Sequence, residues 1–410
     1  MHYLIIGNSI ASVGCIEAIR KLDTTNPITV VGEESHPCYA RPLISYLLEK
    51  RTDEEKMVYR PTKFYETNQV SLITGKTVIQ VDAQVKQAIL DDGTTLPYDK
   101  LLLATGSKPF IPPMKGLDTV KQQFTFLTLD AAKALDAAIQ TESRVLIVGA
   151  GLIGLKCAEG LLKRVQSVTV VDLADRILSS ILDEQAARMV QAHLQAQGIR
   201  FHLKESVAEF IGNEALLQSG IALGFDILVL AIGVRPAITL ATQIGLRTNK
   251  GILIDQACRT SKEDIWAAGD CSEGWELVSR EQRILALLPN AYLQGETAGN
   301  TMANGSARFE NAIAMNAIGF FGLHVITAGI YSGEKTVVPT PNGYKCLFVQ
   351  GNRLVGYILV GSAIERAGIY TALIRNQTDL TTLDFAMISE KPALMAFAQS
   401  VRVQTLGGVQ

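Results

Sequence analysis

The sequence predicts an α/β fold with two domains built on parallel sheets and a third, smaller α+β domain. A strand, a turn that contains glycine and a helix occur twice in the same order, at residues 3–33 and 144–172. A buried apolar strand that runs into a small-residue turn ending in glycine also occurs twice, at 100–106 and 225–233. Strands that alternate with helices are typical of parallel sheets, so duplication of one α/β unit explains both pairs.

Length and composition narrow the class further. A chain of 410 residues with 48% hydrophobic and 19% charged residues suits a globular protein of two or three domains. Its formal net charge of −2 gives no electrostatic case for nucleic acid or an anionic membrane as a partner. A strand is expected from Tyr3, which leaves no room for a signal peptide, and no apolar run reaches spanning length. We therefore predict a cytoplasmic protein.

The cysteines indicate neither a disulfide framework nor a metal site. They are far apart in sequence, none forms a Cys-x-x-Cys pair, and no Cys/His cluster has metal-ligand spacing. In a reducing compartment such residues act mostly as small buried hydrophobes. The six are Cys15, Cys38, Cys157, Cys258, Cys271 and Cys346.

The unit at 144–172 carries a dinucleotide-binding fingerprint. Three glycines at the G-x-G-x-x-G spacing, Gly149, Gly151 and Gly154, follow a predicted buried strand. The other predicted elements are strands at Val145 to Val148 and Val168 to Val171 and a helix from Leu155 to about Lys163. The acid Asp172, about 20 residues after the glycines, completes the pattern, so purely structural glycines are the weaker interpretation.

Each fingerprint position has a physical reason. Gly149 permits a tight turn, Gly151 lets the backbone approach a pyrophosphate, and Gly154 lets the helix pack close to the strand. The pyrophosphate would meet the free N–H groups at the helix N-terminus. Asp172 would bond the hydroxyls of an adenosine ribose and repel a 2′-phosphate, which favours NADH over NADPH. Arg176 lies nearby and could soften this preference.

Residues 3–33 are a degenerate copy of the same unit, with a strand, a helix and a strand expected at 3–6, 10–22 and 28–31. Gly7 is kept, whereas Ser9 and Ser12 occupy the second and third glycine positions; serine is small enough for close approach. The acid after the second strand is Glu33 or Glu34. Two such Rossmann-like units predict two nucleotides with electrons passing between them. The alternative is a first unit that binds nothing.

The remaining elements set the predicted domain boundaries. Strands are expected at 70–73, 77–81, 87–90 and 100–103, with a hairpin turn at Asp92-Gly93. The prolines and glycine of 109–116 predict a stiff connection. In the next part of the chain, a helix is expected at 183–197 and strands at 199–203 and 225–233. A turn-rich stretch follows at 251–310, with a helix near 290–304. The C-terminal part has expected strands at 324–328, 345–349 and 354–360 and a helix at 363–375. Residues 400–410 look weakly structured.

Several motifs together carry a family resemblance. They are Gly7, Ala104-Thr105-Gly106, the central fingerprint, Ala231-Ile-Gly233-Val-Arg-Pro236 and Asp264-Ile-Trp-Ala-Ala-Gly269-Asp270-Cys271. In this order they resemble the two-dinucleotide-binding-domain flavoproteins, the pyridine nucleotide-disulfide oxidoreductase family, over about residues 1–310. The stretches 39–45 and 364–375 are similar to NADH:rubredoxin reductases and nitrite reductase flavin domains, the first also to ferredoxin reductases.

The resemblance implies cofactors and domains. FAD would bind a discontinuous domain, 1–112 with 251–310, into which an NAD(P)H-binding domain, 113–250, is inserted. Residues 311–410 would form an interface domain, often used for dimerisation, so a homodimer is expected. Gly7, Ser9 and Ser12 would face the FAD pyrophosphate and Glu33 its ribose. The other residues placed at the cofactors are Arg41, Pro42, Ala104, Thr105, Gly106, Gly233, Gly269, Asp270 and Ala291.

Two of these assignments have a specific chemical content. Arg41 would supply charge and donors to phosphate or ribityl oxygens. Asp270 would accept from the ribityl chain; the alternative is an Asx-turn or N-cap residue, and in either case it would cap a helix.

Two departures from the family narrow the chemistry. Disulfide and peroxide reductases of the family need a cysteine just after the first unit, whereas here only Cys38 is nearby and it has no partner. Ferredoxin-reductase relatives often place a lysine where Tyr46 stands and a glutamate where Lys156 stands, beside the flavin. We hypothesise that Lys156 puts a positive charge near the flavin. The equally weighted alternative is a solvated lysine on the helix surface.

The sequence thus predicts an FAD-dependent NAD(P)H oxidoreductase that prefers NADH. Hydride would pass from the nicotinamide to the flavin, and electrons would leave for a small redox protein, rubredoxin-like by resemblance. Without cysteine ligands of its own, the chain needs an iron–sulfur or rubredoxin-type acceptor on another protein. The rivals are a disulfide, peroxide or quinone reductase and a flavoprotein redox sensor without turnover.

Overall fold

The computed structural model describes residues 1–398, and the predicted tail at 400–410 lies outside them. The chain divides into two compact units. Unit 1 comprises 1–175, 198–275 and 281–312, and unit 2 comprises 176–197, 276–280 and 313 onward. This division does not separate the two nucleotide-binding halves, so the boundaries at 112 and 250 remain a prediction.

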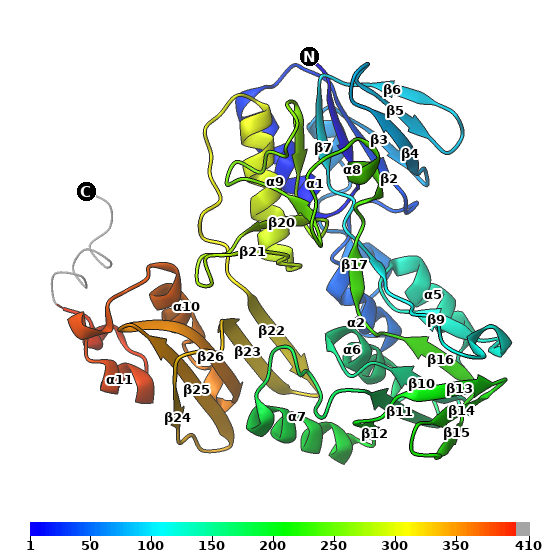
Figure 1. The fold of residues 1–410 in the computed structure, drawn as a ribbon, viewed down its shortest axis with the longest axis vertical. Coiled ribbons are helices and arrows are strands. Elements are labelled where there is room, and N and C mark those ends of the chain that lie inside the picture. Colours follow the sequence, from blue (N-terminus) through cyan, green and yellow to red (C-terminus); the bar gives the residue numbers. More distant parts are fainter. Residues whose placement is uncertain (399–410) are drawn as a thin grey trace. The chain divides into compact units, whose positions relative to one another are not determined.

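The first sheet of unit 1 is the core of the N-terminal half (Figure 1). Its five parallel strands lie in the order β19-β7-β1-β2-β3. Their bounds are β1 Tyr3–Ile6, β2 Ile28–Gly32, β3 Val70–Thr74, β7 Lys100–Leu103 and β19 Ile265–Ala267. β1 and β7 are buried almost throughout, as expected for strands that helices cover on both faces.

The second sheet repeats this arrangement with order β12-β11-β10-β16-β9, also parallel. Its strands are β9 Gln123–Thr125, β10 Arg144–Val148, β11 Ser167–Asp172, β12 Arg200–Leu203 and β16 Ile227–Leu230. The turns match in detail. Gly7 N donates to Val31 O, and Gly149 N to Val171 O, both at 2.8 Å. The predicted duplication is therefore a real structural repeat.

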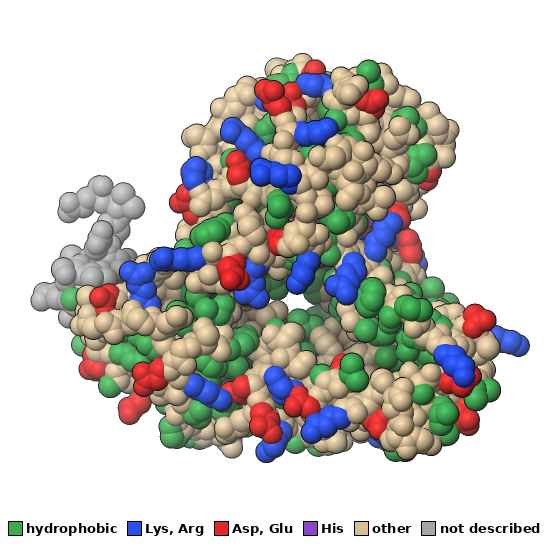
Figure 2. Space-filling view, in the orientation of Figure 1, with side chains coloured by type: hydrophobic (Ala, Val, Ile, Leu, Met, Phe, Trp, Pro, Cys, Tyr) green, Lys and Arg blue, Asp and Glu red, His purple; other side chains and the backbone are tan. Residues whose placement is uncertain are grey.

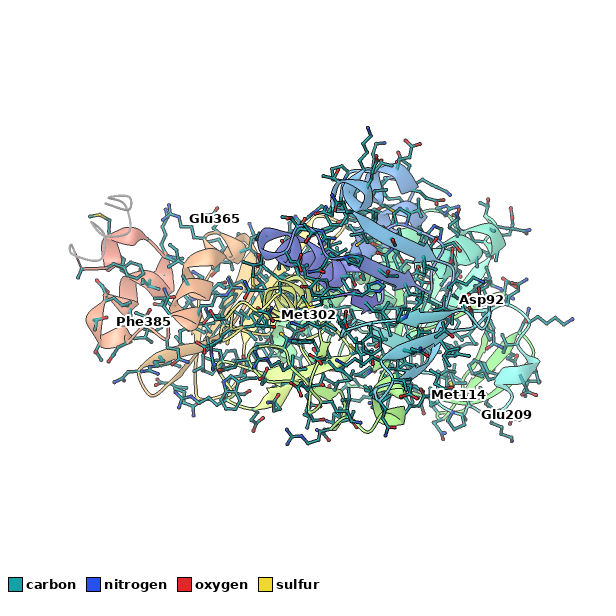
Figure 3. The ribbon with its side chains drawn as sticks, turned by 90° about the horizontal axis from the view of Figure 1, so that it is seen from above. Asp92, Met114, Glu209, Met302, Glu365 and Phe385 are labelled. Atoms are coloured by element: carbon teal, nitrogen blue, oxygen red, sulfur yellow. The ribbon has the colours of Figure 1, made fainter. Side chains whose placement is uncertain are left out.

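Two helices pack unusually closely over the first sheet. They are α1, Ile10–Leu22, and α9, Leu288–Met302. A Cβ atom on Gly295 would lie 1.9 Å from Ala11 O, and one on Gly299 would lie 2.3 Å from Cys15 O. Glycine is thus required at both positions. At the far end of α9, Met302 lies among interior side chains (Figure 3).

Shorter elements connect the two halves of unit 1. The antiparallel pair β8, Ser107–Pro109, and β17, Val234–Pro236, joins them where only a stiff connection was predicted. α2, Ile44–Leu48, packs on α6, Leu152–Leu161, and on α5, Leu129–Ala138. Two small sheets are antiparallel: one is formed by β4 Val78–Asp82, β5 Gln87–Leu90 and β6 Thr95–Pro97, and the other by β13 Val207–Ile211, β14 Glu214–Leu217 and β15 Ala222–Gly224. A third small sheet is mixed. In it, β20 Ser272–Trp275 runs parallel to β18 Ile252–Leu253 and antiparallel to β21 Gln282–Arg283.

Unit 2 is built on an antiparallel sheet of order β22-β23-β26-β25-β24. The strands are β22 Met315–Phe320, β23 Leu323–Gly329, β24 Glu334–Val338, β25 Gly343–Gln350 and β26 Arg353–Gly361. Helices α10, Ala367–Arg375, and α7, Glu184–Gln197, both pack against β26. α7 lies within 113–250, the predicted NAD(P)H-binding domain, yet it packs with the C-terminal sheet.

Several predicted boundaries differ from the structure. The fingerprint helix begins at Leu152, three residues earlier than predicted, because Gly151 already serves as its N-cap. The helix predicted at 363–375 begins at Ala367, because Arg366 has φ +59° and interrupts it after a short 3-10 turn. The helix predicted from Asp183 begins at Glu184, and Asp183 caps it by accepting from Ala186 N at 3.0 Å.

Candidate functional site

A cavity of about 690 Å³ opens where β1, β2 and β7 end. The N-terminus of α1 and the start of α9 also border it. The predicted FAD-side residues that line it are Gly7, Ser9, Glu33, Arg41, Ala104, Thr105, Gly106, Gly269, Asp270 and Ala291. Two others, Ser12 and Pro42, do not line it. The carboxyl edge of a parallel sheet is the place where such folds bind ligands.

The turn after β1 forms part of the cavity wall. Gly7 has φ +113°, and a Cβ there would lie 2.0 Å from Ala104 O, so only glycine fits. Ser9 is the N-cap of α1 and makes no side-chain hydrogen bond to the first backbone N–H groups of the helix, and Ser9, Ile10 and Ala11 line the cavity. Ser12 is buried and donates to Gly7 O at 2.5 Å, which holds the turn from behind.

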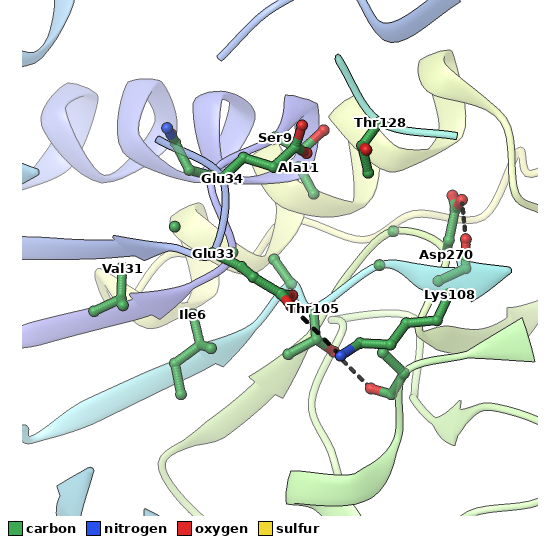
Figure 4. Close-up of a pocket in the computed structure, with 18 of the residues that line it drawn as sticks. Ile6, Ser9, Ala11, Val31, Glu33, Glu34, Thr105, Lys108, Thr128 and Asp270 are labelled. Carbon is green, nitrogen blue, oxygen red and sulfur yellow. Dashed lines mark hydrogen bonds and ion pairs between the residues drawn. The ribbon is translucent and has the colours of Figure 1, made fainter. Parts of the chain in front are cut away.

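The two acids after β2 behave differently (Figure 4). Glu33 is largely exposed at the rim and lies 3.6 Å from Lys108, so its carboxylate keeps acceptor capacity for a ribose. Glu34 is turned to the other side, where it accepts from Arg41 Nη2 at 2.7 Å and from Tyr39 OH at 2.7 Å. The choice between the two acids, which sequence left open, thus favours Glu33 for the ribose.

Arg41 is mostly buried, and two of its donors are already used. Nη1 donates to Leu127 O at 2.9 Å, and Nη2 donates to Glu34. Since a guanidinium has five N–H donors, three remain for a ligand in the cavity. Its position is fixed before any ligand binds.

Asp270 faces the cavity from the opposite side. Its carboxylate accepts from Ser107 Oγ at 3.2 Å, a contact drawn in Figure 4. Burial raises the pKa of Asp270, while the Ser107 hydrogen bond and the charge of Arg41 act to lower it. The prediction that Asp270 caps a helix is wrong, because strand β20 follows it at Ser272. A half-buried carboxylate with one partner is suited to accept from a ligand hydroxyl.

The start of α9 is fixed to the turn that carries Asp270. Gln294 Oε1 accepts from Gly269 N at 2.8 Å and from Ser272 Oγ at 3.1 Å, and all three groups are buried. Ala291 and Leu288, one turn earlier, reach the cavity wall. These residues, the cavity and the glycine-only turn fit FAD, which needs a pyrophosphate cradle and acceptors for its hydroxyls.

The second turn is built to the same plan. A Cβ on Gly149, which has φ +118°, would lie 2.2 Å from Ala231 O, and one on Gly154 would lie 2.0 Å from Gly149 O. By contrast, nothing lies within 4 Å of a Cβ on Gly151, so this glycine leaves open space at the helix N-terminus. That opening suits the close approach of a pyrophosphate.

Asp172 is held firmly beside this turn. Its two oxygens accept from Ala150 N at 2.5 Å and from Ala174 N at 2.7 Å. Each carboxylate oxygen keeps a second lone pair, so a ribose diol can still bind. Gly233, with φ +127°, lies after the neighbouring strand β16.

Lys156 does not line the cavity; it belongs to a cluster between α6 and α2. Its ammonium pairs with Glu159, whose side chain is almost fully buried, and lies 4.8 Å from the centre of the Tyr46 ring. Gly160 permits the close approach of the two helices, because a Cβ there would lie 2.8 Å from Ser45 O. The solvated-surface alternative does not describe this lysine, which is 16% exposed.

The cysteine side chains lie outside the cavity wall. All six cysteines are buried and unpaired in the described chain, and none lines the cavity. Burial raises the pKa of Cys38 to about 12, so little thiolate forms at neutral pH. Within residues 1–398, no group of three or more His, Cys, Asp and Glu side chains could hold a metal ion. Over the same range, no helix has the length and apolar character required to cross a bilayer.

The sequence missed one part of the site. Tyr39, Glu34 and the segment Leu127–Leu129 form a hydrogen-bonded wall of the cavity. Polar residues scattered over almost a hundred positions give no local pattern, so only the adjacency of Glu34 to Glu33 pointed here. Charged side chains of both signs are scattered over the visible face of the molecule, in keeping with the near-neutral net charge (Figure 2).

Two similar strand–glycine–helix turns, one beside a large cavity, suit a protein that binds two nucleotide cofactors. Comparison with known proteins agrees: residues 1–295 match the family described as pyridine nucleotide-disulphide oxidoreductase. The chain belongs to this family. It is an oxidoreductase that uses FAD and a pyridine nucleotide, with NADH favoured.

Curated relatives sharpen the likeness. The chain is 32% identical to the NADH-dependent phenylglyoxylate dehydrogenase subunit epsilon of Aromatoleum evansii, over 93% of each chain. It is 35% identical to a rubredoxin-NAD(+) reductase of Alcanivorax borkumensis, over 89% of this chain and 96% of the relative. Over 92% of its own length the chain is 31% identical to the nitrite reductase (NAD(P)H) of Bacillus subtilis, but the match covers only 48% of that larger protein. The resemblance to rubredoxin and nitrite reductases is thereby confirmed.

A solved structure confirms the fold. The covalent putidaredoxin reductase–putidaredoxin complex contains a chain that matches all of this one and 99% of its own length. The TM-score is 0.88 at 21% identity, which establishes a common fold.

Proposed function

We propose that this protein passes electrons from NADH through FAD to a small one-electron redox protein of the rubredoxin type. The observation that carries the proposal is the cavity wall, in which none of the described lining residues is a cysteine. A disulfide or peroxide reductase would need a reactive thiol there. Electrons would therefore leave the flavin directly for an external acceptor, as the name of the Alcanivorax relative suggests.

The residues of the first half would hold and orient FAD. The turn at Gly7 and Ser9 would receive the pyrophosphate, Glu33 the ribose, and Asp270 a ribityl hydroxyl. Arg41 would neutralise phosphate charge with its remaining donors. When bound, FAD supplies a ring that accepts hydride and returns electrons singly. The protein contributes binding, orientation and electrostatics.

The second half would bind NADH. Gly151 would admit the pyrophosphate and Asp172 would accept from the ribose hydroxyls. Because a 2′-phosphate would meet the Asp172 carboxylate, we expect NADH to react faster than NADPH. Faster flavin reduction by NADPH would overturn this role for Asp172.

Lys156 remains a proposed flavin-side charge. Its ammonium links the NADH-side helix α6 to Tyr46 on α2, directly after the Arg41-Pro42 stretch. Replacing it in Lys156→Ala should change the flavin potential and the rate of reduction by NADH. If both stay unchanged, Lys156 has only a structural role.

The deciding experiment is anaerobic reduction of the FAD-loaded protein by NADH, followed by stopped-flow mixing with acceptors. Rubredoxin or ferredoxin should reoxidise the flavin within the time of turnover, while disulfides, peroxide and quinones should react slowly. Fast reaction with a disulfide would contradict the proposal. Slow reaction with every acceptor, with a long-lived charge-transfer band and a change of oligomeric state, would favour a redox sensor.

A second candidate is the NADH-reacting subunit of a larger oxidoreductase. The Aromatoleum relative, a subunit by name, aligns over 93% of both chains. The acceptor would then be an iron–sulfur group on a partner subunit. Copurification of the untagged genomic protein with a stable partner would favour this arrangement. A homodimer and a cytoplasmic location stay predictions, the first of which size-exclusion chromatography with light scattering can check.

A further inference from the structure

One wall of the FAD cavity comes from the NADH-binding half of unit 1. Leu127, Thr128 and Asp130 line the cavity, and they follow β9, the edge strand of the second sheet. Ala237, Thr239 and Leu240 also come from 113–250, and every other lining residue lies within 6–109 or 268–291. Thr128 caps α5 by accepting from Ala131 N at 3.1 Å, so this wall is the beginning of a helix. Figure 4 shows Thr128 and Glu34 in the same view of the cavity.

Glu34 is the residue that fastens this wall. Oε1 accepts from Arg41 Nη2 at 2.7 Å, and Oε2 accepts from Tyr39 OH at 2.7 Å and from Leu129 N at 3.3 Å. Leu129 N also donates to Tyr39 OH at 2.8 Å, and Arg41 donates to Leu127 O. One carboxylate thereby ties the loop after β2 to both sides of the Thr128 cap.

This contact is more shielded from water than two other ion pairs made by the same stretch of chain. The Glu34 side chain is 21% exposed, whereas Asp130, which pairs with His36 at 2.6 Å, is 60% exposed. The pair of Lys133 with Glu54 is about half exposed on both sides. Exposed ion pairs contribute little, while a shielded carboxylate with three donors resists the loss of any of them.

We propose that Glu34 is a positioning residue for FAD: it holds the α5 wall on the cavity and orients Arg41. This rests on the proposed FAD site. A glutamine at this position cannot satisfy all three donors, because its NH₂ group would face either the guanidinium or the Tyr39–Leu129 pair. The wall would then open more often, and FAD would leave faster. Flavin retention is thereby linked to the NADH-binding half.

The test compares Glu34→Gln with Glu54→Gln in the FAD-loaded protein. Glu54→Gln also removes the charge of a carboxylate that pairs with α5, at Lys133, but Glu54 does not line the cavity. Two quantities are measured: the rate of FAD release into excess apo-acceptor, and hydrogen exchange of the 127–131 amides at saturating FAD. We expect Glu34→Gln to release FAD at least tenfold faster and to exchange these amides faster, while Glu54→Gln resembles the wild type. Tyr39→Phe should give an intermediate result, because the ring stays and the hydroxyl's hydrogen bonds with Glu34 and Leu129 N are lost, while Glu34 keeps its bonds with Arg41 and Leu129 N.

The outcomes separate this proposal from its rivals. If Glu34→Gln releases FAD and exchanges like Glu54→Gln, Glu34 has no positioning role. If FAD leaves faster but the 127–131 amides at saturating FAD keep wild-type exchange, Glu34 acts on FAD without the wall, directly or through Arg41, and the wall proposal is overturned. If the wild-type protein retains no FAD at all, the proposed function fails first.

Discussion

Gly295→Ala is the sharpest test of how the fold shapes the site. Gly295 lies on α9 where that helix crosses α1, and an added Cβ would lie 1.9 Å from Ala11 O and 2.7 Å from Ala11 C. Ordinary contact begins near 3.4 Å, so the helices would have to separate by about 1.5 Å. Neither atom can rotate away, because both are backbone.

The expected cost follows from overpacking. Forcing a methyl group into a close-packed contact costs about 1–3 kcal/mol, and the alanine regains up to ~1 kcal/mol of helix propensity. Because Ala11 and Ala291 line the cavity from these two helices, the separation should also weaken FAD binding. The matched control is Gly368→Ala on α10, where an added Cβ meets nothing within 4 Å. This change should be neutral or slightly stabilising.

Urea unfolding followed by tryptophan fluorescence gives the measurement. Trp266 is buried and donates to Thr301 on α9 at 2.9 Å, so its emission reports on this region. Gly295→Ala should lower the unfolding midpoint and the FAD content together, while Gly368→Ala lowers neither. Equal midpoints for the two variants would show that the α1–α9 contact yields without cost, and the argument from close packing would be wrong.

Three further predictions concern charge and thiols. Burial of Glu17 acts to raise the pKa of this carboxyl, but hydrogen bonds from Arg60 and Tyr292 outweigh it and lower the pKa. The ionised carboxylate therefore stabilises the folded protein above about pH 4.5, and this stabilisation is lost as pH falls through the lowered pKa. Acid unfolding of Glu17→Gln should accordingly be less steep than that of the wild type between pH 5 and about 3. The amide of Asp172→Asn has one acceptor oxygen and cannot accept from both Ala150 N and Ala174 N. Half-saturation of flavin reduction should therefore need at least tenfold more NADH, at unchanged FAD content. If the NADH concentration for half-saturation stays the same, Asp172 is not part of the ribose site. Burial raises the pKa of the Cys38 thiol, so Cys38→Ser should keep NADH-driven flavin reduction, and a thiol reagent should label the native protein slowly; loss of turnover in that variant would reveal a thiol relay.

Local patterns explain what the sequence could predict. The two strand–glycine–helix units depend on neighbouring residues, since a turn of φ +113° or +118° accepts only glycine next to a strand. The same holds for Asp172, whose distance from the fingerprint is set by one helix and one strand. Most of the predicted FAD-side residues accordingly lie around one cavity.

Contacts between segments that are distant in sequence explain which features the sequence alone could not predict. Glu34 meets Leu129, 95 positions away, through a backbone N–H that no residue type announces. Asp270 was predicted to cap a helix, but strand β20, which pairs with the distant β18, follows it instead. The partner of Lys156 is different: Glu159 lies three residues on, a spacing that predicts an ion pair on a helix.

The position of α7 bears on how such a chain can be recombined. Asp183 at its start accepts from Tyr344 OH at 2.5 Å and pairs with Lys335, and His193 donates to Phe320 O at 3.0 Å. Residues 311–410 therefore cannot be exchanged alone between related proteins. In such a chimera, α7 would pack against a sheet from another protein. A viable exchange must move 176–197 and 276–280 with them, three segments from one compact body. Chimeras that exchange 311–410 alone should be insoluble, whereas chimeras that exchange all three segments should fold.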